Sequence, residues 1–396
     1  METHSSLSER IESLDRATLT PIVQRATHCP GVLTHWQAVP IRISIGGLSG
    51  SLIYRFSGGI EDSRQEQPWS LVLKVTSLAP QTKGLVSNNV NNFSREFEFY
   101  RSDLAHGFPP GFRAAYSYGQ SEEMNPSGQP EYWIWLEDME RYPSNQWGLD
   151  EFYQAALGLG KFNGAYLSHI PLPEAPWLKR NQIRQYLQMT EPSFQRLFTL
   201  HKVPVIQILF PPDQINSLER LWQDRERHLT LLERLPHTLC HGDAQFSNLF
   251  LVPTPGEAIE TVAIDWSSVG ISPLGLDLAQ FFMFCIFFGE QNTAQATETA
   301  LFQGYLDGVR AAGWQDDPRL VRLGFTSAML KVRATSVRRF MEFISDDGLP
   351  TGWLKGWVQD QNISLDEWAE SISWVHPYTH KLFEESLELR SQLSYG

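Results

Sequence analysis

Cysteine is scarce in this chain of 396 residues, which has only Cys29, Cys240 and Cys285. An odd number of cysteines without C-x-x-C spacing gives neither a disulfide framework nor a cysteine-based zinc site. The few unpaired cysteines fit a reducing compartment. Because the first residues also lack an apolar signal segment, we expect a cytoplasmic protein.

Basic residues are in a minority, with 32 Lys and Arg against 45 Asp and Glu and a formal net charge of −13. Nucleic-acid binding needs a basic face that neutralises phosphates, so this charge argues against a nucleic-acid partner. Long hydrophobic runs are missing too. The most apolar stretch, FFMFCIFF at 281–288, is far too short to span a membrane and is typical of a buried helix. We expect no membrane partner, and the oligomeric state stays open.

What is present is enough apolar material for globular packing, with 42% hydrophobic residues and 13 tryptophans. The length suggests two domains or lobes. The first part is predicted to be rich in strands and the rest mostly helical. The sequence therefore predicts an α+β fold with a β-rich N-lobe at 1–139, a mostly helical C-lobe at 140–396 and an active site in the cleft between them. We expect strands near 41–45, 51–56, 70–75, 112–119, 131–137, 247–252 and 260–264, and helices near 88–105, 149–167, 214–234, 275–288, 292–312 and 317–344.

The segment TLCHGDAQFSNLFLV at 238–252 places polar residues between two apolar runs. Asp243 and Asn248 lie five positions apart, so on a tight loop one can meet a substrate hydroxyl and the other a magnesium ion. The strand TVAID ends at Asp265, and a hairpin would bring this carboxylate beside Asn248. Magnesium prefers one or two carboxylates with water and phosphate oxygens, so the pair is a sufficient protein shell. Taken singly, Asp243 could cap a turn and Asp265 could merely end a strand.

HGDAQFSN followed by AIDW resembles the catalytic and metal motifs of the aminoglycoside phosphotransferase and choline kinase-like enzymes, which are small-molecule kinases of the two-lobed protein-kinase-like fold. The resemblance implies that Asp243 is the catalytic base or orients the hydroxyl, and that Asn248 and Asp265 hold Mg2+. It implies a buried structural role for His241. It also implies that Asp277, in PLGLDLAQFF, braces the catalytic loop, although a carboxylate that stabilises a helix start is the alternative.

A glycine-rich stretch, ISIGGLSGSLIYRF, lies between two expected strands. Small residues there let backbone N–H groups approach phosphates. The stretch is not a Walker A loop, and Ile45 stands where a kinase glycine loop has its first glycine. By itself it favours a hairpin turn, but its position before Lys74 favours a phosphate loop. The nucleotide-binding candidates in it are Gly46, Gly47, Ser49, Gly50 and Ser51.

Lys74 stands in the apolar strand LVLKV and needs an anionic partner, unless its stem carries the charge outward to solvent. The following helix offers Glu96 and Glu98. Helical phase places Glu96 at the edge of the apolar stripe and Glu98 on the far side. We therefore predict that Glu96 pairs with Lys74, and the resemblance points to the same residue.

The adenine of ATP is expected at the junction WIWLEDMERY, where backbone groups from Glu137 to Met139 would meet its edge. Leu136 and Met139 would supply apolar contacts. The last hundred residues carry no motif of the family, but KVRATSVRRF at 331–340 and GWLKGW at 352–357 are possible contributors to an acceptor pocket.

His376 and His380 have the i, i+4 spacing of metal ligands. They lack a nearby third ligand, and Pro377 lies between them, so they are predicted to be surface residues.

Together these features predict an ATP- and magnesium-dependent phosphotransferase that moves the γ-phosphate to a hydroxyl of a small molecule. An aminoglycoside, an amino alcohol, a sugar or another natural product could be the acceptor. One alternative is a kinase-like nucleotide-binding protein without catalysis. Another is a protein kinase. The short stretch between Asp265 and the next helix argues against it, because that stretch leaves no room for an activation loop. A metal-dependent hydrolase would have no use for the glycine-rich stretch or for Lys74.

Overall fold

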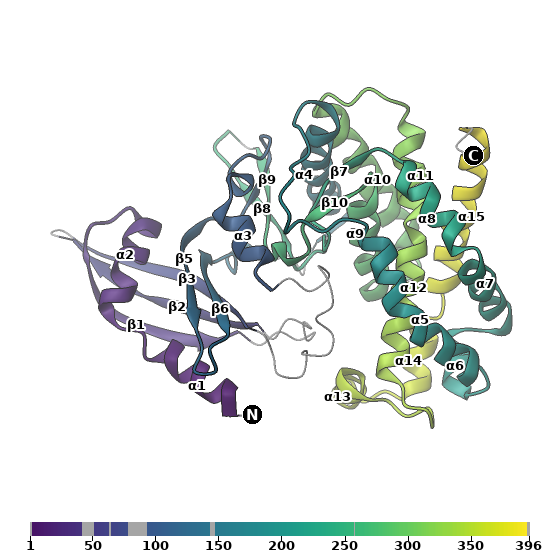
Figure 1. Cartoon of the computed structure of the whole chain (residues 1–396), viewed down its shortest axis with the longest axis horizontal. Coiled ribbons are helices and arrows are strands. Elements are labelled where there is room, and N and C mark those ends of the chain that lie inside the picture. Colours follow the sequence, from purple (N-terminus) through teal and green to yellow (C-terminus); the bar gives the residue numbers. More distant parts are fainter. Residues whose placement is uncertain are drawn as a thin grey trace. The chain divides into compact units, whose positions relative to one another are not determined.

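The structure is a computed structural model that describes residues 2–41, 51–62, 65–77, 93–142, 147–256 and 258–393. The chain forms two compact units. The N-terminal unit consists of Met1–Phe108, Arg113–Pro143 and Val262–Ser267. The C-terminal unit consists of Pro109–Phe112, Ser144–Thr261 and Ser268–Gly396. Figure 1 shows the order of the helices and strands along the chain.

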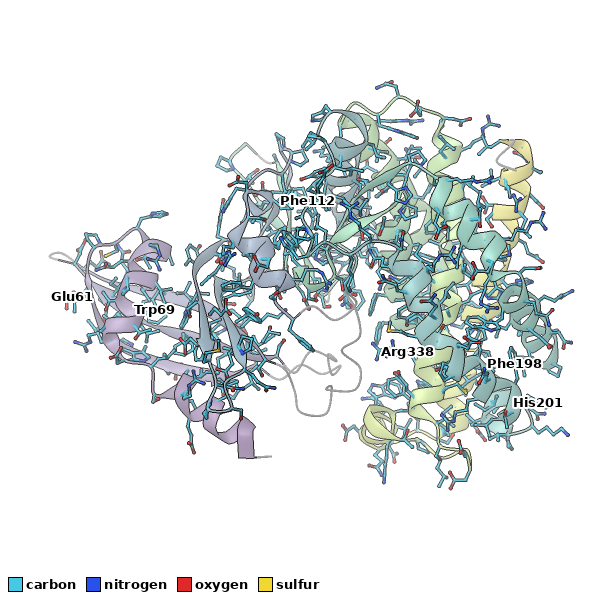
Figure 2. The ribbon with its side chains drawn as sticks, in the orientation of Figure 1. Glu61, Trp69, Phe112, Phe198, His201 and Arg338 are labelled. Atoms are coloured by element: carbon cyan, nitrogen blue, oxygen red, sulfur yellow. The ribbon has the colours of Figure 1, made fainter. Side chains whose placement is uncertain are left out.

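The N-terminal unit is built on a five-stranded antiparallel sheet of order β1-β2-β3-β6-β5. Alternate apolar side chains of the central strands lie on one face of the sheet and form a core with residues of the first two helices. Trp69 of β3, labelled in Figure 2, belongs to this core. The elements are α1 (Glu2–Glu12), α2 (Arg16–Thr27), β1 (Val32–Pro40), β2 (Leu52–Glu61), β3 (Glu66–Ser77), α3 (Arg95–Arg101), η2 (Asp103–Ala105), β5 (Ser117–Met124) and β6 (Pro130–Glu137).

Two elements of this unit differ from the sequence prediction. The first strand is Val32–Pro40, whereas a strand was expected at 41–45. Ile41 follows that strand, and 42–45 lie outside the described residues. The strand was missed because most of its residues are exposed, which removes the alternation of apolar and polar residues. The helix expected at 88–105 is α3 followed by η2, and its predicted start lies outside the described residues.

The C-terminal unit is mostly helical. Its longest helices pack closely where glycine allows it, as at Gly308, where a Cβ would lie 2.2 Å from the carbonyl oxygen of Leu157. The helices are α4 (Leu149–Ser168), α5 (Gln182–Leu200), α6 (Pro204–Leu209), α7 (Pro212–Gln223), α8 (Arg225–Arg234), α9 (Leu276–Phe288), α10 (Ala294–Ala311), α11 (Pro318–Ser327), α12 (Met329–Phe343), α13 (Gly352–Asp360), α14 (Leu365–Ile372) and α15 (Val375–Gln392).

Short strands complete the fold. β10 (Gly270–Pro273) pairs antiparallel with β7 (His237–Cys240), and a three-stranded sheet has the order β4-β9-β8, with β4 (Phe112–Ala114), β8 (Leu249–Pro253) and β9 (Ile259–Ala263). The helices expected at 214–234 and 317–344 are each divided in two, at Asp224 and at Ala328. The apolar run 281–288 is the largely buried second half of α9, as expected. No helix in the described ranges is long and apolar enough to cross a membrane.

The prediction for His376 is wrong. This histidine lies on α15 with no exposed surface, and its ring packs against those of Phe210 and Phe340 at centroid distances of 4.3 and 5.7 Å. Burial and the nearby Arg333 guanidinium lower the pKa of His376 to about 3. His380, one turn later, keeps partial exposure and bonds to Ser217. The i, i+4 pair therefore spans the edge of the core.

Candidate active site

Lys74 is the centre of a charged cluster in the N-terminal unit. Its ammonium lies 2.6 Å from Glu96 Oε2 and 2.9 Å from Asp265 Oδ1. The strand β3 supplies the lysine, α3 supplies the glutamate, and Asp265 follows β9. The predicted pairing with Glu96 is confirmed. Glu98, the alternative on the same helix, is half-buried and pairs with Arg101 at 3.3 Å.

The pKa values of Lys74 and Glu96 are shifted by burial, by each other and by the Asp265 carboxylate. Burial would lower the pKa of Lys74, but the carboxylates of Asp265 and Glu96 outweigh it and raise that pKa above its usual range. Burial raises the pKa of Glu96, and the lysine offsets part of this effect. The cluster therefore holds a permanent cation beside a carboxylate of Asp265 whose side chain is 36% exposed.

The helix α3 anchors the segment that carries Asp265. The buried Arg95 donates from Nη1 to the carbonyl oxygen of Ser267 at 2.8 Å, and the backbone N–H of Trp266 donates to Glu96 Oε1 at 3.3 Å. The Trp266 ring stacks on Phe99 with centroids 4.3 Å apart. These contacts hold Asp265 at φ 60°, a left-handed conformation that costs energy for a residue other than glycine.

Of the residues in the glycine-rich stretch, Gly46, Gly47, Ser49 and Gly50 lie outside the described residues. Ser51 is described, and its hydroxyl lies 3.2 Å from that of Thr76 on β3. Its expected role toward phosphate stays a prediction.

The adenine candidates lie at the end of β6 and just after it. Leu136 and Met139 are buried. The Glu137 carboxylate accepts two bonds from the Arg113 guanidinium, at 2.7 and 3.2 Å, and its backbone N–H donates to the carbonyl oxygen of Tyr116. Asp138, which sequence reasoning did not single out, accepts a bond from Arg55 Nε at 2.8 Å. The junction is therefore rigidly held, with its Glu137 N–H already used.

In the C-terminal unit, Asp277 braces the HGD turn. The buried carboxylate at the start of α9 accepts the backbone N–H groups of His241 and Gly242, both at 2.8 Å. Gly242 has φ 80°, and a Cβ there would lie 2.2 Å from the carbonyl oxygen of Ser268, so only glycine fits. His241 is fully buried, and its Nδ1 accepts the N–H of Asp243 at 3.3 Å. The bracing geometry and the burial of His241 are those the resemblance implies.

A buried asparagine on α4 extends this brace. Asn163 donates to the carbonyl oxygen of Leu239 at 2.8 Å and to Asp277 Oδ2 at 3.3 Å. Its own side-chain oxygen accepts a bond from the Tyr305 hydroxyl at 2.7 Å. All these groups are buried, and a buried polar group without a hydrogen bond costs free energy. Each hydrogen bond of this network removes that cost for both of its partners.

Three carboxamides surround the Asp243 carboxylate. Asn248 Nδ2 lies 3.2 Å from Oδ2, Gln245 Nε2 lies 3.3 Å from the same oxygen, and Gln280 Nε2 lies 3.5 Å from Oδ1. Asn248 Nδ2 also donates to the Asp243 carbonyl oxygen at 3.0 Å. Since the amide nitrogen of Asn248 is used in this way, its side-chain oxygen is the atom left to face a cation.

The structure thus brings together two sets of the predicted residues. Lys74, Glu96 and Asp265 meet in the N-terminal unit, and His241, Asp243, Asn248 and Asp277 meet in the C-terminal unit. Within the part of the chain that the structure describes, no three or more His, Cys, Asp or Glu side chains form a metal cluster. The magnesium shell of Asn248 and Asp265 stays a prediction.

Sequence reasoning missed Arg95, Gln280 and Lys331 as parts of these two sets. Lys331 on α12 is buried and donates to Gln280 Oε1 at 2.9 Å. Gln280 lies three positions after Asp277 and so on the same face of α9, a signal that helical spacing offers. Lys331 begins the KVRATSVRRF stretch that was named as a possible contributor to the acceptor pocket, but its contact with Gln280 was not foreseen, because that partner is 51 positions away.

Comparison with known sequences adds an independent observation. The phosphotransferase enzyme family matches residues 172–315. The chain resembles this family, as its motifs predicted. With that match, the prediction of an enzyme of the small-molecule kinase class is confirmed. Among curated proteins, none matches the chain.

Solved structures also resemble the chain. An amicoumacin kinase in complex with AMP-PNP, Ca2+ and Ami has a TM-score of 0.50 at 15% identity, covering 93% of this chain and 96% of that one. A choline/ethanolamine kinase family protein from Mesorhizobium loti has a TM-score of 0.46 at 12% identity, with coverages of 94% and 98%. An aminoglycoside phosphotransferase from Streptomyces rimosus, in complex with ADP and streptomycin, has a TM-score of 0.42 at 13% identity, with coverages of 82% and 99%. The first likeness confirms the predicted protein-kinase-like α+β fold.

Proposed function

We propose that the protein is an ATP- and magnesium-dependent kinase that transfers the γ-phosphate to a hydroxyl of a small molecule. The observation that carries this proposal is the bridge from Lys74 to Glu96 and Asp265, at 2.6 and 2.9 Å. A buried cation fixed between two carboxylates suits the binding of phosphate oxygens next to a metal ion. The similar amicoumacin kinase, solved in complex with AMP-PNP, supports a nucleotide ligand.

The donor set fits magnesium. Asp265 offers a carboxylate that is 36% exposed, and Asn248 offers its amide oxygen. Hard oxygen donors of this kind, completed by water and phosphate oxygens, are those that Mg2+ prefers. When bound, the ion would neutralise charge on the phosphates.

Side chains of the protein would bind the phosphates and orient the acceptor. Lys74 would hold phosphate oxygens, with Glu96 fixing its direction. Asp243 would orient the acceptor hydroxyl and take its proton as the new oxygen–phosphorus bond forms. The carboxamides of Gln245, Asn248 and Gln280 would keep the Asp243 carboxylate in one orientation. Leu136 and Met139 remain our candidates for apolar contacts to adenine, and the glycine-rich stretch for phosphate contacts.

The connection from Asp265 to α9 favours a small-molecule kinase over a protein kinase. Only ten residues, 266–275, separate them. They form the 3-10 helix η3 (Trp266–Ser268) and β10, whose Gly270 and Pro273 pair with Cys240 and His237 of β7. This leaves no long segment that could present a protein substrate or be reshaped by phosphorylation.

Two measurements test the proposal. Thermal-shift titration of ATP and GTP, with and without magnesium, should give a magnesium-dependent rise in the unfolding midpoint. ADP release across a panel of hydroxylated metabolites and antibiotics should then identify an acceptor. Asp265→Ala should remove the magnesium dependence, and Asn248→Ala should weaken it less, because the carboxamide carries no charge. Calorimetry that finds the same magnesium dependence in Asp265→Ala would contradict the assignment.

A further inference from the structure

A buried ammonium lies behind the catalytic loop of the C-terminal unit. Lys331, on α12, is 8% exposed, and Gln280, on α9, is 7% exposed. The lysine donates to Gln280 Oε1 at 2.9 Å, and the amide nitrogen of the same glutamine lies 3.5 Å from Asp243 Oδ1. One carboxamide therefore separates the Lys331 charge from the group that we assign to the acceptor hydroxyl.

Among the described residues, the buried Lys331 ammonium has too few hydrogen-bond acceptors and no nearby counter-ion to offset its charge. Of its three N–H donors one is used by Gln280, and in the described ranges no carboxylate lies within ion-pair distance of it. Asp243 and Asp277 attract it only at longer range. Both oxygens of Asp277 already accept backbone N–H groups.

A second cation lies in the same neighbourhood. Lys331 Nζ and the Arg338 guanidinium lie 5.9 and 5.7 Å from the centroid of the Tyr186 ring on α5. Arg338, labelled in Figure 2, is neutralised by Glu342 on its own helix at 2.7 Å. The ring and Gln280 help to hold Lys331, but neither carries a negative charge.

Holding Gln280 in place does not by itself explain a lysine. A neutral donor could fix the amide at lower cost, because burying an ammonium without a counter-ion is strongly unfavourable. The charge is therefore best explained by a ligand group that satisfies the remaining N–H donors when the acceptor binds.

We propose that Lys331, braced by Gln280, is a specificity-determining residue that selects acceptors with an anionic or oxygen-rich group near the reacting hydroxyl and disfavours those with an ammonium group there. This rests on the proposed function and narrows its acceptor to neutral or anionic hydroxy compounds, such as sugars and hydroxy acids. Amino alcohols and polycationic aminoglycosides would place like charge beside Lys331.

The test is ADP release from Mg-ATP with acceptors matched in all but charge. Glucuronate, glucose and glucosamine form one matched set, choline and streptomycin are added as cationic probes, and the wider hydroxylated panel is sorted into the same three charge classes. For the wild type we expect kcat/KM to be at least tenfold higher for the best neutral or anionic acceptors than for any cationic one. Lys331→Met should remove most of this preference, and Lys331→Glu should reverse it. Lys331→Arg should still prefer neutral or anionic acceptors to cationic ones.

The controls separate selectivity from folding. Lys381→Met, which removes an exposed lysine of α15, should leave the preference unchanged. Thermal unfolding and the KM for ATP should stay close to wild type in Lys331→Met, so that the change appears in the kinetic constants for the acceptor alone. If Lys331→Met fails to fold, Lys331→Arg still tests the sign of the preference.

Two results would overturn the inference, and they differ. A wild type that prefers cationic acceptors, or a preference unchanged by Lys331→Met, refutes the role of Lys331 and leaves the kinase intact. Absence of nucleotide binding and of transfer to every compound refutes the proposed function and, with it, this inference.

Discussion

At the scale of single residues, Asp243 is the group on which the proposed chemistry depends. Its carboxylate accepts bonds from neutral carboxamides, so we expect its removal to disturb the neighbouring fold little. We expect Asp243→Asn and Asp243→Ala to lower turnover about 10²- to 10⁴-fold, the usual contribution of a positioned acid or base. Nucleotide affinity should stay near wild type, because Asp243 is assigned to the acceptor.

Steady-state kinetics with the acceptor found by ADP release, together with calorimetric titration of ATP, measure both quantities. Turnover of Asp243→Ala within tenfold of wild type would show that another group takes the proton. A large loss of ATP affinity would place Asp243 on the nucleotide instead.

Gly242 gives a second test at this scale, and Gly256 provides a matched control. Both have positive φ, 80° and 87°, but a Cβ at Gly242 would lie 2.2 Å from a backbone oxygen, whereas at Gly256 no atom of the described residues lies within 4 Å. Gly256→Ala should cost only the backbone strain, about 1 kcal/mol. Gly242→Ala should cost more, because the HGD turn must move away from Ser268.

Thermal unfolding and turnover should therefore both fall in Gly242→Ala, while Gly256→Ala should lose a little stability and keep its turnover. Equal losses of stability in the two variants would mean that the turn relaxes without strain.

At the scale of elements, α3 links the strand that carries Lys74 to the segment that carries Asp265. Lys74→Ala should lower catalytic efficiency strongly, because the phosphate-binding charge is lost and burial then favours the protonated form of Glu96. Glu96→Gln should do similar but smaller damage, since Lys74 keeps Asp265 as a partner. The two residues act as one unit, so the double variant should be much less impaired than the product of the single effects.

A kinetic double-mutant cycle on kcat/KM measures this coupling, with Glu98→Gln as the control. Glu98 pairs with Arg101 at the surface of the same helix, so its variant should be close to neutral. If the losses of kcat/KM in Lys74→Ala and Glu96→Gln are fully additive, or if Glu98→Gln loses more than Glu96→Gln, the functional coupling of Lys74 and Glu96 is refuted.

The same elements show how far sequence reasoning reaches. Helical phase chose Glu96 over Glu98 correctly, because one apolar stripe fixes which side of a short helix faces the core. The bracing role of Asp277 was accessible through the resemblance of PLGLDLAQFF to a motif of the kinase family. The contacts of Arg95 and of Lys331, which lies in the stretch 331–340 named for the acceptor pocket, were not accessible, because their partners are 172 and 51 positions away and only the fold brings them together.

Strand prediction failed where burial was weak. β1 is mostly exposed, so its sequence lacks the alternation that marks β2 and β3. The expected boundary at 139/140 rests on a change of pattern along the chain. Such a pattern cannot show that Val262–Ser267, far downstream, packs into the N-terminal unit.

At the scale of the whole molecule, His376 makes stability depend on pH. Its pKa in the folded chain is about 3, below the usual 6.5, because it is buried beside Arg333. Between these values the unfolded chain binds a proton that the folded chain does not. Stability is therefore complete above pH 6.5 and falls as the pH drops below it, by about 1.4 kcal/mol per pH unit from this residue.

His376→Phe should remove that part of the slope. Neither ring nitrogen has a hydrogen-bond partner in the described ranges, so the phenyl ring should be tolerated beside Phe210 and Phe340. Unfolding midpoints at about pH 7.5, 6.5 and 5.5 give the comparison, since they bracket the usual pKa of histidine. Parallel curves for wild type and variant would show that His376 is protonated without unfolding.

The short connection between Asp265 and α9 has a consequence for control. Seven of its ten residues belong to a 3-10 helix or to the strand that pairs with β7, so no long loop is left there that could act as a switch. We expect the folded enzyme to be constitutively active, with no need for phosphorylation of this segment. The rate of phosphate transfer in the cell would then be set by the expression level of the protein and by the concentration of the acceptor.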